Sequence, residues 1–297
     1  MLKRVIHLPV FALLLLSGCA GSHYIQKKAL NMIGPAVPDL IDSMLKQRSG
    51  SVAKEGIAGN ILLLAAMAEM TPDNKTYLVA VSMAYTSYAM LIEDENEEFS
   101  VELYTIAKEF GLRALMTDDD FKEAYEKGGI EATKEAIEDM GKDYVPALIW
   151  TALSWGMCML KTMSKDAMAV QHLHNLEHMI KHAIEEDEKY FYGISHLFQM
   201  VIAAFMPPMM GGTPERVEEE FKKVMKISNF SLHLAYVYYV EFYAIPYELE
   251  DKFDEMLEIV INTPTSKYPN IALLNEISKM KARRLLNNKS EFFYWVD

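Results

Sequence analysis

FMPPMMGGTPERVEEEFKKVMKI (residues 205–227) and FYAIPYELEDKFDEMLEIV (residues 242–260) share one layout. Each begins with the aromatic end of one helix, passes through a proline-containing turn and continues into an acidic helix start, a phenylalanine and an apolar stripe. The matched positions, all 32 residues apart, are Phe221/Phe253, Met225/Leu257 and Ile227/Ile259. Two helices in a period of about 34 residues are typical of tetratricopeptide repeats. Such pairs cannot bury their apolar sides alone, so we expect them to stack into a curved solenoid with a concave face.

The helical pattern continues through most of the chain, where apolar residues recur at helical spacing and strand-like alternation is absent. Residues 77–92 and 99–115 form an earlier pair of the same shape without the proline turn. Thr213 and Pro214 are typical of an N-cap and a first helical position. The sequence predicts helices over residues 38–46, 52–69, 75–92, 99–115, 118–126, 130–140, 145–162, 166–185, 190–205, 213–227, 231–243, 247–261 and 271–286. The predicted fold class is all-α, a tetratricopeptide-like helical-repeat solenoid; a non-repeating helical bundle is the alternative.

The amino-terminal residues have the pattern of a secretory leader. Lys3 and Arg4 precede a short apolar run, which is followed by small residues and Cys19. The run is too short to span a bilayer as a helix. The motif LSGC (residues 16–19) resembles a bacterial lipobox, which implies diacylglyceryl attachment at Cys19. We therefore expect a signal peptide (1–18), a lipidated tether (19–37) and a helical-repeat domain (38–297); in the alternative, the protein is secreted and Cys19 is incidental.

The composition limits the partners of this chain. It carries 29 basic and 42 acidic residues, a net charge of −13, which argues against binding nucleic acid. The same charge argues against the body lying on an anionic membrane, so we expect the lipid to make the membrane contact. Ala20, rather than aspartate, favours the outer membrane. Cys158 has no disulfide partner once Cys19 is acylated, and its apolar surroundings indicate a small buried side chain.

Motifs for enzyme chemistry are absent from the sequence. It contains no Gly-rich nucleotide-binding motif and no G-x-S-x-G nucleophile elbow. His174, His178 and His182 fall on one helix face, and a pair of them plus another group could chelate Zn²⁺ or Cu²⁺. The outer two lie about 12 Å apart along a helix, so all three cannot reach one ion. We interpret this histidine stripe as a polar surface, predict no cofactor and no enzymatic activity, and keep a metal-dependent enzyme as a third hypothesis.

Aromatic residues are concentrated in the segment YVYYVEFYAIPY (residues 236–247), which holds six of them. A helix distributes these side chains over more than one face. They could line an inner channel, since pockets for apolar ligands are lined by aromatic side chains. The alternative is ordinary packing between repeats.

Three segments resemble the TatT family, the periplasmic lipoprotein T components of TRAP transporters: residues 145–156 (VPALIWTALSWG), 190–224 and 241–257. FGLRAL (110–115) and KMKARRLL (279–286) also fit. The resemblance implies a tetratricopeptide-like fold, a lipid anchor, homo-oligomers, an internal channel for apolar ligands and association with the solute-binding P component of the transporter. It implies no catalytic residues.

The sequence therefore predicts a lipid-anchored accessory protein that docks a periplasmic solute-binding P component and shelters or passes an apolar organic ligand. A generic scaffold for cell-envelope assembly, without a small ligand, is the alternative. The residues predicted to line the ligand site are Trp150, Trp155, Tyr192, His196, Tyr239 and Tyr243, with Met209, Met210, Gly211 and Gly212 in the adjoining loop.

Overall fold

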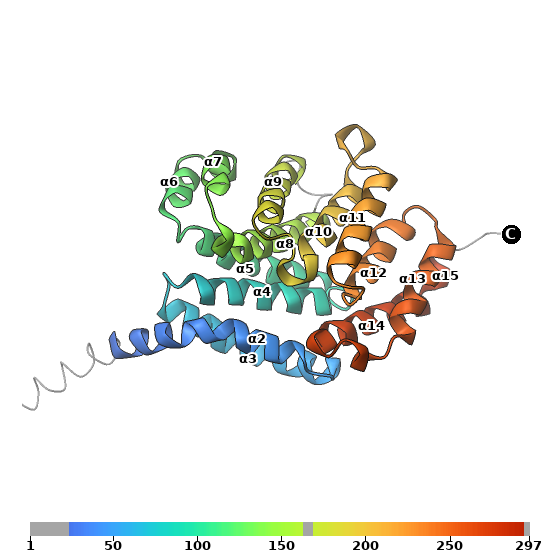
Figure 1. Ribbon diagram of the computed structural model, residues 1–297, viewed down its shortest axis with the longest axis horizontal. Coiled ribbons are helices and arrows are strands. Elements are labelled where there is room, and N and C mark those ends of the chain that lie inside the picture. Colours follow the sequence, from blue (N-terminus) through green and yellow to red (C-terminus); the bar gives the residue numbers. More distant parts are fainter. Residues whose placement is uncertain (1–23, 163–168, 294–297) are drawn as a thin grey trace, which may run out of the picture.

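The structure is a computed structural model that describes residues 24–162 and 169–293. Helices and short connections make up these two ranges, and neither contains a strand (Figure 1). The prediction of an all-α fold is confirmed. The predicted leader and Cys19 lie outside the described residues, as do residues 166–168 of the helix predicted at 166–185.

Ten α-helices carry most of the packing. They are α3 (Gly50–Met70), α4 (Lys75–Ile92), α5 (Glu97–Leu115), α8 (Val145–Thr162), α9 (Ala169–Asp187), α10 (Ile194–Phe205), α11 (Pro214–Ile227), α12 (Leu234–Tyr239), α13 (Glu250–Asn262) and α14 (Ala272–Asn287). The remaining elements are η1 (Gly34–Ala36), α2 (Val37–Leu45), α6 (Asp119–Gly128), η2 (Ile130–Thr133), α7 (Lys134–Glu138), η3 (Lys142–Tyr144), η5 (Tyr190–Gly193), η6 (Pro208–Met210), the π-helix η7 (Val240–Ala244), η8 (Thr265–Lys267), η9 (Pro269–Ile271) and α15 (Lys289–Phe292).

Polar side chains cap many of the helix starts, because the first backbone N–H groups of a helix have no partner within it. The side chain of Asn74 accepts hydrogen bonds from the first turn of α4, and Asp118 accepts one from the N–H of Phe121 in α6. Thr213 accepts from the N–H of Arg216 at 3.2 Å, which confirms its predicted role as the N-cap of α11.

The structure differs from the sequence-based expectation in several places. Residues 24–33, predicted as a tether, are helical. This segment contains good helix formers, and the hydroxyl of Tyr77 donates to the carbonyl of Leu30, which ties the helix to α4. The helix predicted at 130–140 divides into η2 and α7, and the one at 190–205 divides into η5 and α10. The helix predicted at 231–243 becomes α12 followed by a π-helix.

The helices pack in chain order around α4, which contacts α3, α5 and α8. The α5–α8 crossing is close because Gly111 faces Thr151, and a Cβ at Gly111 would meet the Thr151 hydroxyl. The pairs α10–α11 and α12–α13 follow, with Phe253 fully buried in α13 and its counterpart Phe221 half-buried in α11. The tetratricopeptide period remains a prediction.

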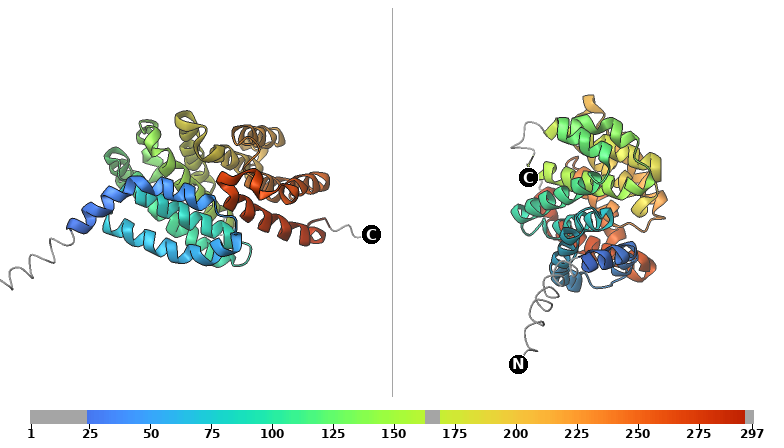
Figure 2. Two further views of the ribbon diagram at one scale, coloured as in Figure 1. Left: turned by 60° about the horizontal axis from the view of Figure 1, so that its bottom comes forward. Right: turned by 90° about the vertical axis from the view of Figure 1, so that its left-hand side faces the viewer.

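The last long helix returns to the first part of the chain. Helix α14 packs against α13 and also against α2 and α3, while η9 contacts α2 (Figures 1 and 2). The two ends of the helical array therefore meet. A solenoid with free ends has no such contact between its first and last units.

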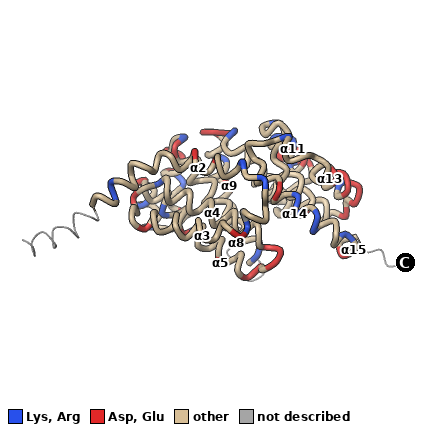
Figure 3. Tube along the Cα trace, turned by 90° about the horizontal axis from the view of Figure 1, so that it is seen from below, with Lys and Arg blue, Asp and Glu red and all other residues tan. Residues whose placement is uncertain are grey.

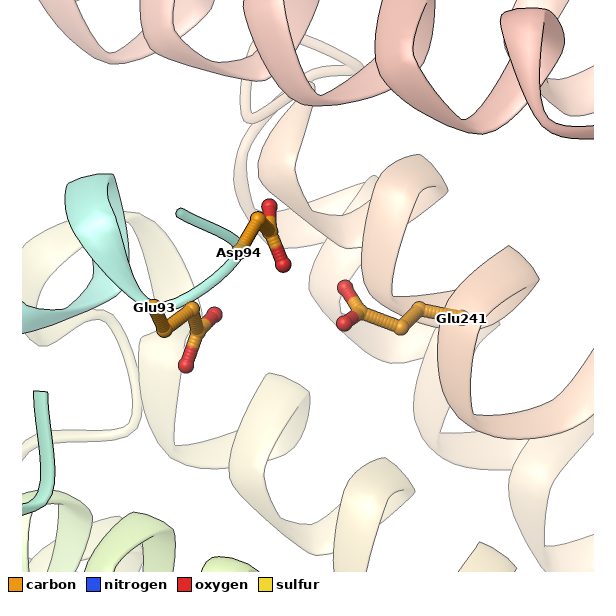
Figure 4. Close-up of side chains that lie close together, drawn as sticks. All are labelled: Glu93, Asp94 and Glu241. Carbon is orange, nitrogen blue, oxygen red and sulfur yellow. The ribbon is translucent and has the colours of Figure 1, made fainter. Parts of the chain in front are cut away.

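A buried group of charged residues lies where these ends meet, and we call it the closure cluster. It consists of Glu93 and Asp94 after α4, Lys161 of α8, Glu241 of η7, and Lys281 and Arg284 of α14. Figure 4 shows its three carboxylates. Nζ of Lys281 lies 2.8 Å from Glu93 and 3.0 Å from Asp94, and Arg284 lies 2.6 Å from Asp94. The side chain of Lys281 is only 4% exposed. Three carboxylates thus face three cations, of which Lys281 is buried and Arg284 is partly exposed.

The charged groups of the closure cluster shift one another's pKa values. Burial alone would raise the pKa of Glu93, but Lys281 and Lys161 outweigh it and hold that pKa below its usual value. Burial, together with repulsion from Glu93 and Asp94, raises the pKa of Glu241. Burial would lower the pKa of Lys281, yet the three carboxylates raise it. Among the cations near Glu93, Lys281 has the largest effect in holding the pKa of that carboxylate down.

Replacement of Lys281 by methionine should be strongly destabilising. Lys281→Met leaves Glu93 and Asp94 buried with fewer counter-ions, and breaking a buried pair costs about 3–5 kcal/mol. Chemical denaturation should show a loss of this order in the free energy of unfolding. Lys289→Met is the matched control, because Lys289 pairs with Asp254 at the surface and such pairs contribute about 0–1 kcal/mol. Equal losses for the two variants would contradict the role given to the closure cluster.

Candidate functional site

A cavity of about 250 Å³ lies between α2 and α4, with η3 and η5 closing its sides. We call it the α2–α4 groove. Its volume is slightly below the roughly 300–1,000 Å³ of pockets for drug-sized ligands. Its lining is mostly apolar and consists of Val37, Pro38, Ile41, Asp42, Lys75, Thr76, Val79, Ala80, Met83, Asp143, Pro146, Tyr190 and Phe191.

The charged side chains at this groove are fixed by local contacts. Nζ of Lys75 lies 2.6 Å from Asp143 and 3.2 Å from the centre of the Tyr144 ring. The hydrogen bond from Lys75 holds the pKa of Asp143 below its usual value. Lys75 lies at the start of α4 and Asp143 lies in η3, so this pair joins the two elements beside the apolar lining.

One wall of the groove has a strained backbone. Phe191 (φ 44°) and Tyr192 (φ 62°) both adopt left-handed conformations, and Gly193 (φ 77°) follows them. Non-glycine residues rarely adopt positive φ, and each such residue costs of order 1–3 kcal/mol. This turn lies within η5 and presents Phe191 to the groove. Strain of this kind persists only where surrounding contacts hold it.

Trp150 supports the strained wall from behind. Its indole Nε1–H donates to the hydroxyl of Tyr190 at 3.0 Å, and its ring packs edge-on against Phe191 at 5.2 Å. Trp150 is 2% exposed, so it backs the groove wall instead of lining the groove. Burial raises the pKa of Tyr190 to about 12, which keeps its hydroxyl neutral.

The other residues predicted to bind ligand are distributed over several environments. Tyr192 adjoins the groove wall and contacts Phe191, whereas Trp155 is half-buried beside His172 and Lys108. Tyr239 and Tyr243 are buried and form a row of aromatic contacts with Phe221 and Tyr247. The Tyr239 hydroxyl also donates to Glu218.

His196 is held between two carboxylates. Its Nδ1 lies 2.6 Å from Glu220 and its Nε2 lies 3.3 Å from Glu188. Burial would raise the pKa of Glu220, but hydrogen bonds from His196 and Lys223 outweigh it and lower that pKa. His196 is itself buried, so its contacts join α10 to α11.

The predicted loop residues lie together between α10 and α11. Met209 is 92% exposed, while Met210 packs partly against the core. Gly211 has a positive φ of 89°, and its carbonyl accepts a hydrogen bond from Arg216. A Cβ at Gly212 would lie 1.8 Å from the carbonyl oxygen of Met206, so only glycine fits there.

The histidine stripe on α9 meets three different surroundings. His174 is exposed, His178 lies 3.6 Å from Glu138, and Nε2 of His182 lies 2.6 Å from the carbonyl oxygen of Met140. The carboxylates of Glu93, Asp94 and Glu241 come within 4.8 Å of one another, a spacing that could hold a cation. Lys281 and Arg284 already supply positive charge there.

None of the ten residues predicted to bind ligand is among the residues that line the groove. Its lining comes from four separate segments, near residues 37–42, 75–83, 143–146 and 190–191, and no motif joins them. The one feature of the sequence that points to the groove is the aromatic run Tyr190–Tyr192. The prediction includes Tyr192 from this run, whereas Tyr190 and Phe191 line the cavity.

Comparison with known proteins identifies the family of this chain. The model of the TRAP transporter T-component family matches residues 47–293, which is most of the chain. The chain belongs to the TRAP transporter T-component family. This confirms the resemblance found in the sequence. A comparison with curated proteins finds no match.

Membership defines the general role of the chain as an accessory component of TRAP transport at the cell envelope, and the family is not one of enzymes. Within residues 24–162 and 169–293, no helix combines the length and apolar character needed to cross a membrane.

The glycine at position 212 offers a test of the loop geometry. Gly212→Ala should lower the free energy of unfolding by about 1–3 kcal/mol, because the new Cβ forces the backbone away from Met206. Gly56→Ala in α3 is the control, since its Cβ meets nothing within 4 Å and alanine favours the helix by about 1 kcal/mol. Thermal unfolding of the two variants should shift in opposite directions; a stable Gly212→Ala protein would contradict the loop structure.

Proposed function

We propose that this T component is a lipid-anchored periplasmic protein that docks the solute-binding P component of a TRAP transporter and shelters an apolar organic ligand in the α2–α4 groove. The anchor is the acylated Cys19, with the outer membrane favoured. The family match supports the transport role. The observation that carries the ligand proposal is the apolar groove, with its strained aromatic wall.

The groove suits part of a small apolar molecule or one chain of an amphiphile. Val79, Ala80 and Met83 supply apolar surface, and burial of such surface contributes about 25 cal/mol per Å². Lys75 and Asp143 lie beside this surface and can interact with a polar end. Trp150 and Tyr192 act with the groove by holding Phe191 in place.

The second group of predicted residues suits a protein partner. Met209 is almost fully exposed, and Phe205, at the end of α10, is 40% exposed. Exposed apolar side chains that lie close together often mark protein interaction sites. We assign the Met209–Gly212 loop to docking of the P component, and we retain a homo-oligomer as part of the proposal. The alternative is a generic scaffold without a small ligand.

Filling the groove should abolish uptake of an apolar probe. Val79 is half-buried in the groove wall, so Val79→Trp should occupy the cavity and lower the affinity for N-phenyl-1-naphthylamine at least several-fold, measured by fluorescence titration. Val52→Trp is the matched control, because Val52 is exposed on α3 and its variant should bind as the unmodified protein does. Equal binding by both variants would contradict the groove as the ligand site. A lack of binding by the unmodified protein would favour the alternative, a scaffold protein without a small ligand.

The docking assignment has a separate test. In a detergent extract, Met209→Asp should strongly reduce co-purification of the P component, since a charge would be buried at the interface. Leu62→Asp alters an exposed apolar side chain on α3, outside the loop, and should leave co-purification unchanged. Undiminished recovery with Met209→Asp would exclude the loop as the docking surface.

A further inference from the structure

The exposed apolar side chains are unevenly distributed along the chain. Fourteen large apolar side chains are exposed among the described residues, and nine of them lie between residues 24 and 63. The helical segment over residues 24–33, η1 and α2 carries six of the nine: Tyr24, Ile25, Met32, Ile33, Leu40 and Met44. Residues 24–63 therefore hold nine of these exposed side chains, against five in the much longer remainder of the described chain.

Most of these side chains form a stripe with helical spacing. Ile25, Met32, Ala36, Leu40 and Met44 are all exposed, at intervals of four or seven residues. We call this the N-terminal stripe. The positions that follow its later members, Val37, Ile41 and Leu45, face inward and are buried or half-buried. The segment thus has two apolar faces, one packed against the protein and one directed outward.

The chain from residue 24 to residue 54, which contains this segment and continues into the start of α3, has a charge opposite to that of the rest of the protein. Residues 24–54 contain five basic and two acidic residues, whereas residues 55–297 contain 22 basic and 40 acidic residues. Lys28, Lys46 and Arg48 are exposed, and none of them takes part in an ion pair among the described residues. These basic groups are available to an anionic surface. The acidic character of the whole chain, which argued against membrane contact, belongs to the residues beyond this segment.

The stripe also lies close to the proposed anchor and on one side of the molecule. Four residues separate Cys19 from Tyr24, so extended chain keeps Tyr24 within roughly 18 Å of the acylated residue. Helices α2 and α3 lie at the bottom of Figure 1, and α6 lies at the top. Figure 2 (right) shows the same separation, and Figure 3 views the molecule from the α2–α3 side.

We propose that the N-terminal stripe lies on the surface of a phospholipid bilayer. Its apolar side chains lie at the boundary between headgroups and acyl chains, and Lys28, Lys46 and Arg48 contact anionic headgroups. Amphipathic helices with basic residues bind bilayers in this way. The inference rests on the lipid attachment proposed above and adds a second contact to it. The diacylglyceryl group supplies two acyl chains, and a protein surface beside this anchor adds to the attachment and orients the body. The contact also directs the acidic body and the Met209–Gly212 loop away from the headgroups.

A second copy of the chain is the competing occupant of the stripe. Two copies facing each other through this segment would bring their unpaired basic residues together, which is unfavourable. Charge complementarity therefore favours the bilayer.

The test places a nitroxide label at the stripe of the complete lipoprotein. Leu40→Cys is labelled in a Cys158→Ser background and reconstituted into vesicles of equal parts phosphatidylethanolamine and phosphatidylglycerol. Lys122→Cys, exposed on α6, is the control. The ratio of oxygen to nickel-chelate accessibility should be several-fold higher at position 40 than at position 122, and should fall in phosphatidylcholine vesicles.

An aqueous label at position 40 would overturn the proposal, and so would dipolar broadening between labels on neighbouring copies, because a second copy would then cover the stripe. Mass spectrometry of the same preparation separates this result from failure of the anchor. If the chain is acylated and the label lies in water, only the proposed bilayer contact is contradicted. If the chain is not acylated and the label enters the bilayer, only the proposed lipid anchor is contradicted.

Discussion

Burial of the Glu93 and Asp94 carboxylates against Lys281 is the interaction on which the rest of the structure depends. The residues it joins are separated by 188 positions in the sequence, so one contact connects the end of α4 to α14. Removing charges from water is costly, and this arrangement is stable only because three cations face three carboxylates and Tyr104 donates to Glu93. The two ends of the helical array therefore close on each other and do not remain free.

Closure bears on the groove because both features share α4. The first turns of this helix carry Lys75 and Val79 in the groove, and the residues just beyond its last turn enter the closure cluster. Helix α2, which forms the opposite wall, packs against both α4 and α14. The proposed ligand site, the proposed bilayer surface and the ion cluster are thus connected through two helices. The strained turn at Phe191 adds a wall that Trp150 holds from behind.

The sequence predicted most of the helices, because their limits depend on local chemistry. The bounds of α4 and α8 are those that apolar spacing predicted, Asn74 caps α4, and Thr213 caps α11 as predicted. It could not predict the left-handed turn at Phe191 and Tyr192, since nothing in those two residue types favours a positive φ. Nor could it pair Lys281 with Glu93, or assemble a groove from four segments that only the tertiary fold brings together. It identified Trp150 as a site residue, although this residue supports the wall and does not line the cavity.

The most direct test of this account is native-state hydrogen exchange on the Lys281→Met protein. If closure by buried charge holds the two ends of the array together, amide protection should fall in α14, in α2 and in the C-terminal half of α4 together, and α6 should keep its protection. Loss of protection confined to α14 would contradict the account, because the first helices would then be stable without the ion cluster.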